Sequence, residues 1–102
     1  MTFFVYVIVT RDRRGARTYV GWAVDPDRRL AAHNSGKGAR STRGRTWTLL
    51  HVEALPSKRE AMSREWHLKR DRAFRKRLAA EWMAGAQRTP APTLPAASSP
   101  TS

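Results

Sequence analysis

The chain has 102 residues, which is enough to bury one hydrophobic core and too few for two catalytic domains. It carries 20 lysines and arginines against 8 aspartates and glutamates, a formal charge of +12. Such an excess repels itself in a folded domain unless a polyanion offsets it, so we expect nucleic acid as a partner. No run approaches the roughly 20 apolar residues of a membrane-spanning helix, and the lack of cysteine excludes disulfides and thiolate metal sites.

Two extended segments open the chain. Residues 3–9 form a continuous run of β-branched, aromatic and aliphatic residues, which predicts a strand covered on both faces and central in its sheet. Polar residues and Gly15 interrupt this run, and residues 17–21 resume a short extended stretch. We therefore expect the two segments to form a β-hairpin.

A helix, a loop and a third strand should follow. Asp25 is a suitable N-cap and Pro26 suits the first helical position, so a helix is predicted to about residue 34. Residues 35–45 contain three glycines and four cations, which predicts a flexible basic loop. Residues 47–52 have the composition of a third strand.

The second half of the domain should be helical. Ser57 and Glu60 have the spacing of a capping box, which predicts a helix over residues 58–70. Residues 71–83 form a second helical stretch with an apolar stripe at four-residue spacing, made by Phe74, Leu78 and Trp82. Residues 85–102 are rich in proline, alanine, serine and threonine, which predicts a disordered tail. Residues 1–84 are therefore expected to form one α+β domain with a small sheet.

A glutamate occupies an unexpected place in the first of these helices. On a helical wheel Glu65 falls in the middle of an arc of apolar residues, namely Ala61, Met62, Trp66 and Leu68. A carboxylate in such a position needs a partner, so Glu65 should face a cation, a metal ion or a substrate group. The alternative is a structural salt bridge to one of the many arginines.

Four other residues are candidates for phosphate chemistry. Arg29 and His33 are four apart on a predicted helix, so they share a face and could reach one phosphate. The alternative is a solvated helix face. Tyr6 and Tyr19 lie on the two strands of the predicted hairpin, where each phenol could instead complete the core.

These residues combine into a wider pattern that covers about residues 3–78. The pattern consists of Phe4-Val5-Tyr6, Tyr19-Val20-Gly21, Arg29, His33 and Glu65. It resembles the GIY-YIG endonuclease superfamily. Residues 33–44 resemble its small stand-alone bacterial branch, which is similar to the nuclease module of structure-specific endonucleases. The resemblance implies a small three-stranded antiparallel sheet flanked by helices.

The resemblance also implies an activity, the hydrolysis of phosphodiester bonds with one divalent metal ion, Mg²⁺ or Mn²⁺. In this reading Tyr19 lies against the attacking water as its general base or orienter, and Tyr6 lies beside the scissile phosphate. Arg29 stabilises developing charge and His33 assists proton transfer or holds the phosphate. Glu65 binds the metal ion, and a hard carboxylate oxygen suits either cation.

The sequence departs from the wider family in three ways. Phe4 replaces the first glycine of the name motif, as is common in the stand-alone branch. Trp22 follows Gly21 where several relatives have lysine, so we expect one cation fewer in the site. Most relatives carry a separate DNA-binding domain, so substrate choice must come from this module or from a partner protein.

The basic loop is the candidate nucleic-acid contact. Its cations Lys37, Arg40, Arg43 and Arg45 could hold the phosphate backbone while Trp47 offers an aromatic face to an unstacked base. The alternative is a loop that is merely soluble. We therefore expect an endonuclease for branched or partly single-stranded DNA, favoured over RNA, in the cytoplasm or at the nucleoid. The competing hypothesis is a non-catalytic DNA- or RNA-binding module that keeps the same fold.

Overall fold

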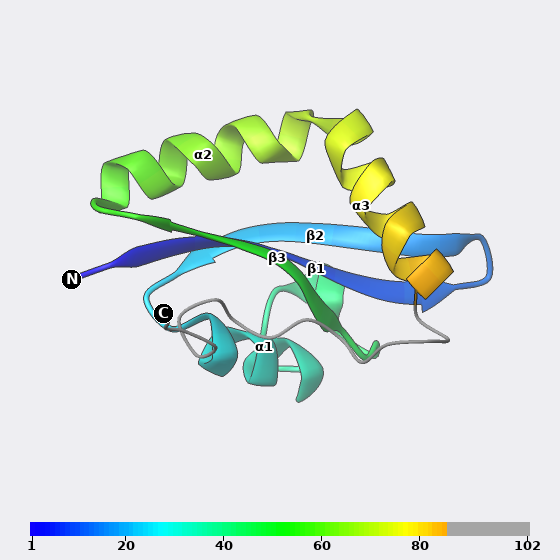
Figure 1. Ribbon diagram of the computed structural model, residues 1–102. Coiled ribbons are helices and arrows are strands. Elements are labelled where there is room, and N and C mark those ends of the chain that lie inside the picture. Colours follow the sequence, from blue (N-terminus) through cyan, green and yellow to red (C-terminus); the bar gives the residue numbers. More distant parts are fainter. Residues whose placement is uncertain (86–102) are drawn as a thin grey trace.

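The computed structural model describes residues 1–85 as a three-stranded antiparallel sheet with helices on both faces (Figure 1). The elements are β1 (Phe3–Asp12), β2 (Gly15–Ala23), α1 (Pro26–Asn34), the 3₁₀ helix η1 (Arg40–Thr42), β3 (Thr48–Leu55), α2 (Lys58–Arg70) and α3 (Arg72–Gly85). The α+β class and the element order predicted from the sequence are confirmed. The predicted disordered tail lies outside the described residues, except that Gly85 ends α3. None of the described helices is long and apolar enough to cross a membrane.

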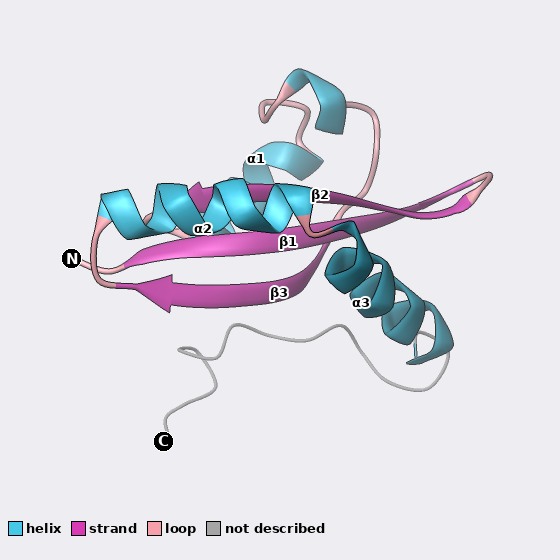
Figure 2. Cartoon of the chain, turned by 90° about the horizontal axis from the view of Figure 1, so that it is seen from above, coloured by secondary structure: helices cyan, strands magenta, loops and turns pink. Residues whose placement is uncertain are grey.

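Strand β1 is the centre of the sheet, as its apolar run predicts. The strand order is β2-β1-β3, and both neighbours pair with β1 in antiparallel fashion (Figure 2). Residues 5–10 of β1 are all buried. Pairing with β2 continues to Asp12, opposite Gly15, whose φ of 123° suits the turn. The strand is therefore longer than the apolar run alone indicates.

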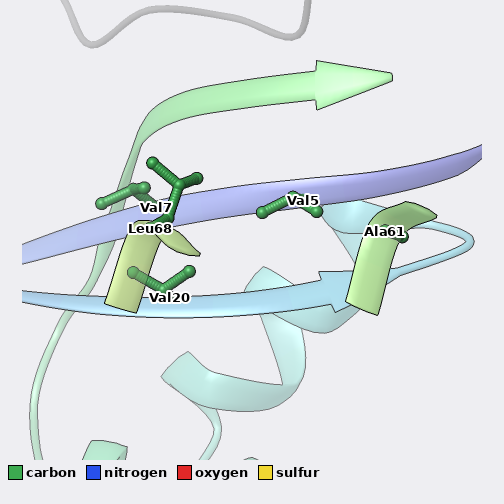
Figure 3. Packing of buried hydrophobic residues seen from close by; sticks show 5 residues of the cluster. All are labelled: Val5, Val7, Val20, Ala61 and Leu68. Atoms are coloured by element: carbon green, nitrogen blue, oxygen red, sulfur yellow. The ribbon is translucent and has the colours of Figure 1, made fainter. Parts of the chain in front are cut away.

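The two faces of the sheet carry different cores. Because side chains alternate along a strand, Val5 and Val7 point to one face and Tyr6 and Ile8 to the other. The first face packs against α2 and α3 through an apolar cluster of Val5, Val7, Val20, Ala61 and Leu68 (Figure 3). The second face packs against α1 and the basic loop through a cluster of Tyr6, Ile8, Ala23, Trp47 and Leu49. We call this second face the tyrosine face.

Side-chain caps fix where the helices begin. The Asp25 carboxylate accepts a hydrogen bond of 3.2 Å from the backbone N–H of Arg28 at the start of α1, as predicted. The Ser57 hydroxyl oxygen accepts one of 3.1 Å from the Glu60 N–H and donates to the Glu60 carboxylate at the start of α2. The Glu60 carboxylate thus takes the serine hydroxyl rather than the backbone N–H of a full capping box.

Two segments differ from the sequence prediction. The expected flexible loop contains η1, and the Thr42 side chain at its end is fully buried. The third strand begins at Thr48 and extends to Leu55, because its last residues continue to pair with the beginning of β1. Trp47 therefore precedes the strand and belongs to the loop.

Candidate active site

Two tyrosines meet on the tyrosine face because of the hairpin register. Tyr6 of β1 is opposite Gly21 of β2, and Tyr19 is opposite Ile8 two residues further along. Tyr6 is buried, and Tyr19 is partly buried and packed against the same cluster. A Cβ atom at Gly21 would overlap the Tyr6 hydroxyl oxygen, so the glycine leaves room for the phenol to cross β2. This steric requirement explains why the Tyr19-Val20-Gly21 motif ends in glycine.

His33 completes the site from the last turn of α1. Its Nε2 atom is 2.9 Å from the Tyr6 hydroxyl oxygen, and its imidazole ring is fully buried. The Tyr19 ring packs against the imidazole with a centroid distance of 5.1 Å. A Cβ atom at Gly38 would overlap the His33 ring, so the basic loop can close over the imidazole only with glycine at this position.

The hydrogen bonds around His33 fix its tautomer. The His33 Nδ1 atom is 2.8 Å from the Thr42 hydroxyl oxygen, which itself donates to the Ala39 carbonyl oxygen at 2.8 Å. The hydroxyl has only one proton, so His33 Nδ1 must donate to Thr42. In the neutral imidazole Nε2 then lacks a proton and accepts the hydrogen bond from Tyr6. The Tyr6 oxygen consequently keeps its lone pairs for another partner.

Burial favours the neutral form of both partners. Burial raises the pKa of the Tyr6 phenol, although the neighbouring Arg29 guanidinium opposes this shift. Burial also lowers the pKa of His33, and the positive charge of Arg29 lowers it further. Arg29 therefore acts on both groups while its own side chain is exposed to solvent. The predicted shared neighbourhood of Arg29 and His33 is present, with the histidine buried and the arginine at the surface.

Glu65 approaches this site from α2. Its negative charge contributes to the raised pKa of Tyr6. The Glu65 carboxylate is mostly buried and lies 3.7 Å from Lys69 Nζ, one turn later on the helix. The ion-pair partner is thus a lysine of the same helix and not an arginine. The predicted apolar arc is narrower than expected, because Ala61 and Leu68 are buried whereas Met62 and Trp66 are about half exposed.

The donor set around Glu65 fits a metal ion that relies on one protein carboxylate. Within residues 1–85 no group of three or more histidine, cysteine, aspartate or glutamate side chains could hold a metal ion. Magnesium commonly takes one or two carboxylates and completes its shell with water and substrate phosphate. Glu65 could supply that carboxylate, since it keeps 22% of its side chain exposed.

The residues predicted to bind nucleic acid separate into three groups. Lys37, Arg40 and Arg43 are exposed on the loop, where they can reach a phosphate backbone. Arg45 lies apart from them, 4.0 Å from Asp12 at the end of β1. Trp47 is only 3% exposed, and its indole N–H donates to the Thr42 carbonyl oxygen at 2.9 Å. The prediction that Trp47 stacks on a base is therefore wrong, because its ring is part of the core.

Trp22 also lies away from the site. Since it follows Gly21, its side chain points to the opposite face, where its ring is 6.2 Å from that of Phe3. The Lys58 ammonium group lies 5.6 Å above the Trp22 ring. A lysine in place of Trp22 would thus not point at Tyr6, so the expected loss of a cation from the site is not supported by the geometry.

Thr42 and Asn34 are contributors that sequence reasoning missed. Thr42 orients His33, and the Asn34 side chain exchanges two hydrogen bonds with the Trp47 backbone, of 2.6 and 3.1 Å. These contacts hold the loop on the end of α1. Nothing in the local pattern distinguishes Thr42 from its polar neighbours, because its role depends on a histidine nine residues away.

Comparisons with known proteins identify the family of this chain. Residues 2–78 match the GIY-YIG catalytic domain family. A UPF0213 protein of Halobacterium salinarum is 50% identical over 66 residues, which are 64% of this chain and 82% of the relative. A UPF0213 protein of Streptococcus pneumoniae is 47% identical over 66% of each chain. The solution NMR structure of a UPF0213 protein from Bacillus halodurans is 39% identical, with a TM-score of 0.43 over 78% of this chain and 84% of that chain. The chain therefore belongs to the GIY-YIG catalytic domain family, a nuclease-type family.

Proposed function

We propose that this protein is a divalent-metal-dependent endonuclease that hydrolyses phosphodiester bonds in branched or partly single-stranded DNA. The observation that carries the proposal is the hydrogen bond from Tyr6 to the Nε2 atom of a neutral, tautomer-fixed His33. A buried phenol in this setting can relay a proton. The location of Arg29, Tyr19 and Glu65 around the same phenol supports the assignment.

The proposed reaction begins with proton transfer from water. The Tyr6 oxygen accepts a proton from the attacking water while its own proton passes to His33 Nε2. The imidazolium that forms keeps its Nδ1–H bond to Thr42, so the histidine need not reorient. This route makes Tyr6 the group that accepts the proton of the water, a role that the family resemblance gave to Tyr19. Tyr19, whose hydroxyl makes no hydrogen bond with residues 1–85, then orients the water or the phosphate.

Two charged groups would stabilise the transition state. The Arg29 guanidinium can donate to the phosphate oxygens on which negative charge develops. Glu65 would hold Mg²⁺ or Mn²⁺, whose positive charge supplies electrostatic stabilisation of the reacting phosphate. Lys69 stays close enough to neutralise Glu65 when no cation is bound. Each charged residue therefore has a distinct task in the proposed site.

The ion pair between Glu65 and Lys69 favours a second candidate function. A metal ion must displace the Lys69 ammonium group, 3.7 Å away, from the carboxylate. If this displacement is unfavourable, the protein is a non-catalytic DNA- or RNA-binding module that keeps the nuclease fold. Its exposed cations would still attract either polyanion.

Cleavage assays on paired glutamate variants test the proposal. Wild type, Glu65→Gln and the matched control Glu81→Gln are incubated with labelled flap, junction, single-stranded and duplex DNA in Mg²⁺, Mn²⁺ or EDTA. Glu81 is an exposed helical glutamate of α3 outside the site. We expect cleavage by wild type and Glu81→Gln, and a loss of about a hundredfold or more in Glu65→Gln and in EDTA, as for other electrostatic contributors.

Each other outcome has a definite meaning. Equal cleavage by Glu65→Gln would refute the metal assignment, and cleavage in EDTA would refute metal dependence. Binding without cleavage by all three proteins would favour the non-catalytic module. If RNA substrates of the same structures were cleaved faster than the DNA substrates, RNA would be the substrate.

A further inference from the structure

A groove of about 570 Å³, away from the tyrosine site, is lined by residues at the end of the β1–β2 hairpin and by residues of α3. Figure 1 shows that α3 lies beside this end of the hairpin. The charged residues that line it are all cations: Arg14, Arg17, Arg72, Arg75 and Lys76. The rest of the lining is small or uncharged. We call this feature the hairpin groove. Its walls come from β2 and α3, which are far apart in the sequence.

One of the five cations builds the groove. Arg75 donates through Nε to the Leu68 carbonyl oxygen at 2.9 Å and through Nη2 to the Lys69 carbonyl oxygen at 2.7 Å. Its Nη1 atom donates to the Thr18 hydroxyl oxygen of β2 at 2.9 Å. These bonds tie the end of α2 and the start of α3 to the sheet. The groove is therefore formed before any ligand binds.

The other four cations are available to a ligand. Arg14, Arg17, Arg72 and Lys76 are exposed, and their side chains make no hydrogen bond or ion pair with residues 1–85. Arg72 lies in the first turn of α3, where the helix dipole disfavours a positive charge. Lys76 follows one turn later on the same side of the helix. These cations therefore do not stabilise the helix, whereas they could bind an anionic ligand.

The hairpin groove is continuous with other basic surface. A neighbouring hollow of about 770 Å³ shares Arg14 and Arg17 with it and adds Arg13 and Arg45. Among residues 1–85, Asp12 is the one acidic residue that lines this hollow, and it lies 4.0 Å from Arg45. A band of cations therefore passes around the end of the hairpin from the basic loop to α3.

Strand β2 relates this band to the tyrosine site. Gly21 is opposite Tyr6, and the groove is lined by residues 15–18 of the same strand. At about 3.4 Å per residue the groove lies about 10–20 Å from Gly21 along β2. Thr18 of the groove points to the face that α3 covers, whereas Tyr6 points to the other face. Because β2 is an edge strand and the Tyr6 hydroxyl lies against Gly21, a polynucleotide that follows this edge can reach both. The separation corresponds to about three to six nucleotides of one DNA strand. We infer that the hairpin groove binds the phosphate backbone of the polynucleotide whose cleaved bond lies at Tyr6, an inference that rests on the proposed function.

Salt-dependent binding tests the inference without requiring cleavage. Binding of a labelled DNA duplex of about 20 base pairs, long enough to span both sites, is measured in EDTA over a series of salt concentrations. The variants are Arg72→Ala/Lys76→Ala, which removes two positive charges, and the control Arg59→Ala, which removes one. Arg59 is an exposed cation in the first turn of α2 that makes no ion pair with residues 1–85. The slope of log K against log salt is negative, and we expect its magnitude to decrease by about 1–2 only in the double variant.

Three outcomes would overturn the inference. An unchanged slope in the double variant would exclude phosphate contacts in the groove. A decrease in Arg59→Ala of about half that size would show that net charge alone explains the effect. Equal affinity of wild type for phosphatidylglycerol vesicles and the duplex would replace the polynucleotide with an anionic surface. Cleavage with an unchanged slope would refute the groove alone, whereas groove-dependent binding without cleavage would refute only the proposed activity.

Discussion

The two faces of the sheet use the same strand for different purposes. Tyr6 and Val7 are adjacent in β1 and about equally buried, yet the Val7 side chain packs in an apolar cluster whereas Tyr6 is hydrogen-bonded to His33. Burial therefore does not distinguish core from site in this domain. What distinguishes the faces is the layer that covers them: the apolar side of α2 on one face, and α1 with a polar loop on the other.

The polar face must satisfy more conditions than the apolar face. An apolar cluster tolerates changes of shape that preserve volume, whereas each buried polar atom needs a partner in the correct donor or acceptor state. Within residues 1–85 no buried side-chain nitrogen or oxygen lacks a partner. The chain from Tyr6 through His33 to Thr42 satisfies this condition in only one tautomer. The same constraint prepares Tyr6 to give its proton to the histidine.

The largest effect that separates the faces should come from Tyr6→Phe. The change removes one hydroxyl and keeps the ring, so the proposed proton relay is lost. We expect single-turnover cleavage to slow by about 10²–10⁴, the usual contribution of a positioned acid or base. The free energy of unfolding should fall by about 1–3 kcal/mol, because His33 Nε2 loses its buried donor. A cleavage rate within a few-fold of wild type would show that Tyr6 only fills space.

Val7→Ala should give the opposite result on the neighbouring residue. The change removes two buried methylene equivalents, each worth about 0.8 kcal/mol, and leaves a cavity, so unfolding should become easier by about 2 kcal/mol. Denaturant titration measures this loss. The cleavage rate of the folded protein should stay close to that of wild type, because Val7 points away from the site. If Tyr6→Phe and Val7→Ala slowed cleavage equally, the two faces of the sheet would not differ in function.

Sequence periodicity explains why much of the site was predictable. Tyr6 and Tyr19 lie in a hairpin whose register follows from alternation and a short turn, and Asp25 fixes the start of the helix that carries His33. These signals are local, so they can be read from the sequence without knowledge of tertiary contacts. The resemblance to a known family added Glu65 to the set, which the helical wheel alone could not assign.

The remaining features depend on contacts between distant residues. Trp47 resembles an exposed loop aromatic in sequence, but hydrogen bonds to Asn34 and Thr42 place it in the core. The role of Arg75 likewise depends on Thr18, 57 residues away. Trp66 shares the apolar arc of Leu68 yet is half exposed, because α2 buries only a narrow stripe against the sheet. Composition carries no information about such partners.

The smallest expected effect is a pH dependence that belongs to the polar face. Burial and Arg29 lower the pKa of His33 from its ordinary value of about 6.5, so the folded protein takes up this proton less readily than the unfolded chain. The folded protein therefore has its full stability above about pH 6.5, where His33 is neutral in both the folded and the unfolded state. As the pH falls from there through the lowered pKa, the unfolded chain binds the proton more readily and the free energy of unfolding decreases. Protonated Nε2 cannot accept from Tyr6, so the cleavage rate should fall over the same range.

The Glu53 carboxylate, on the other face of the sheet, provides a control for this pH dependence. Arg64 lowers the pKa of Glu53 from its ordinary value of about 4.5, so the stability that this pair contributes is lost only at more acidic pH. Melting temperatures between about pH 8 and pH 4 then separate the two groups. His33→Gln should lack the decline that begins near pH 6.5, and Arg64→Gln should keep it. A decline that persists in His33→Gln would show that another group titrates there, and a cleavage rate independent of pH over this range would remove His33 from the proposed relay.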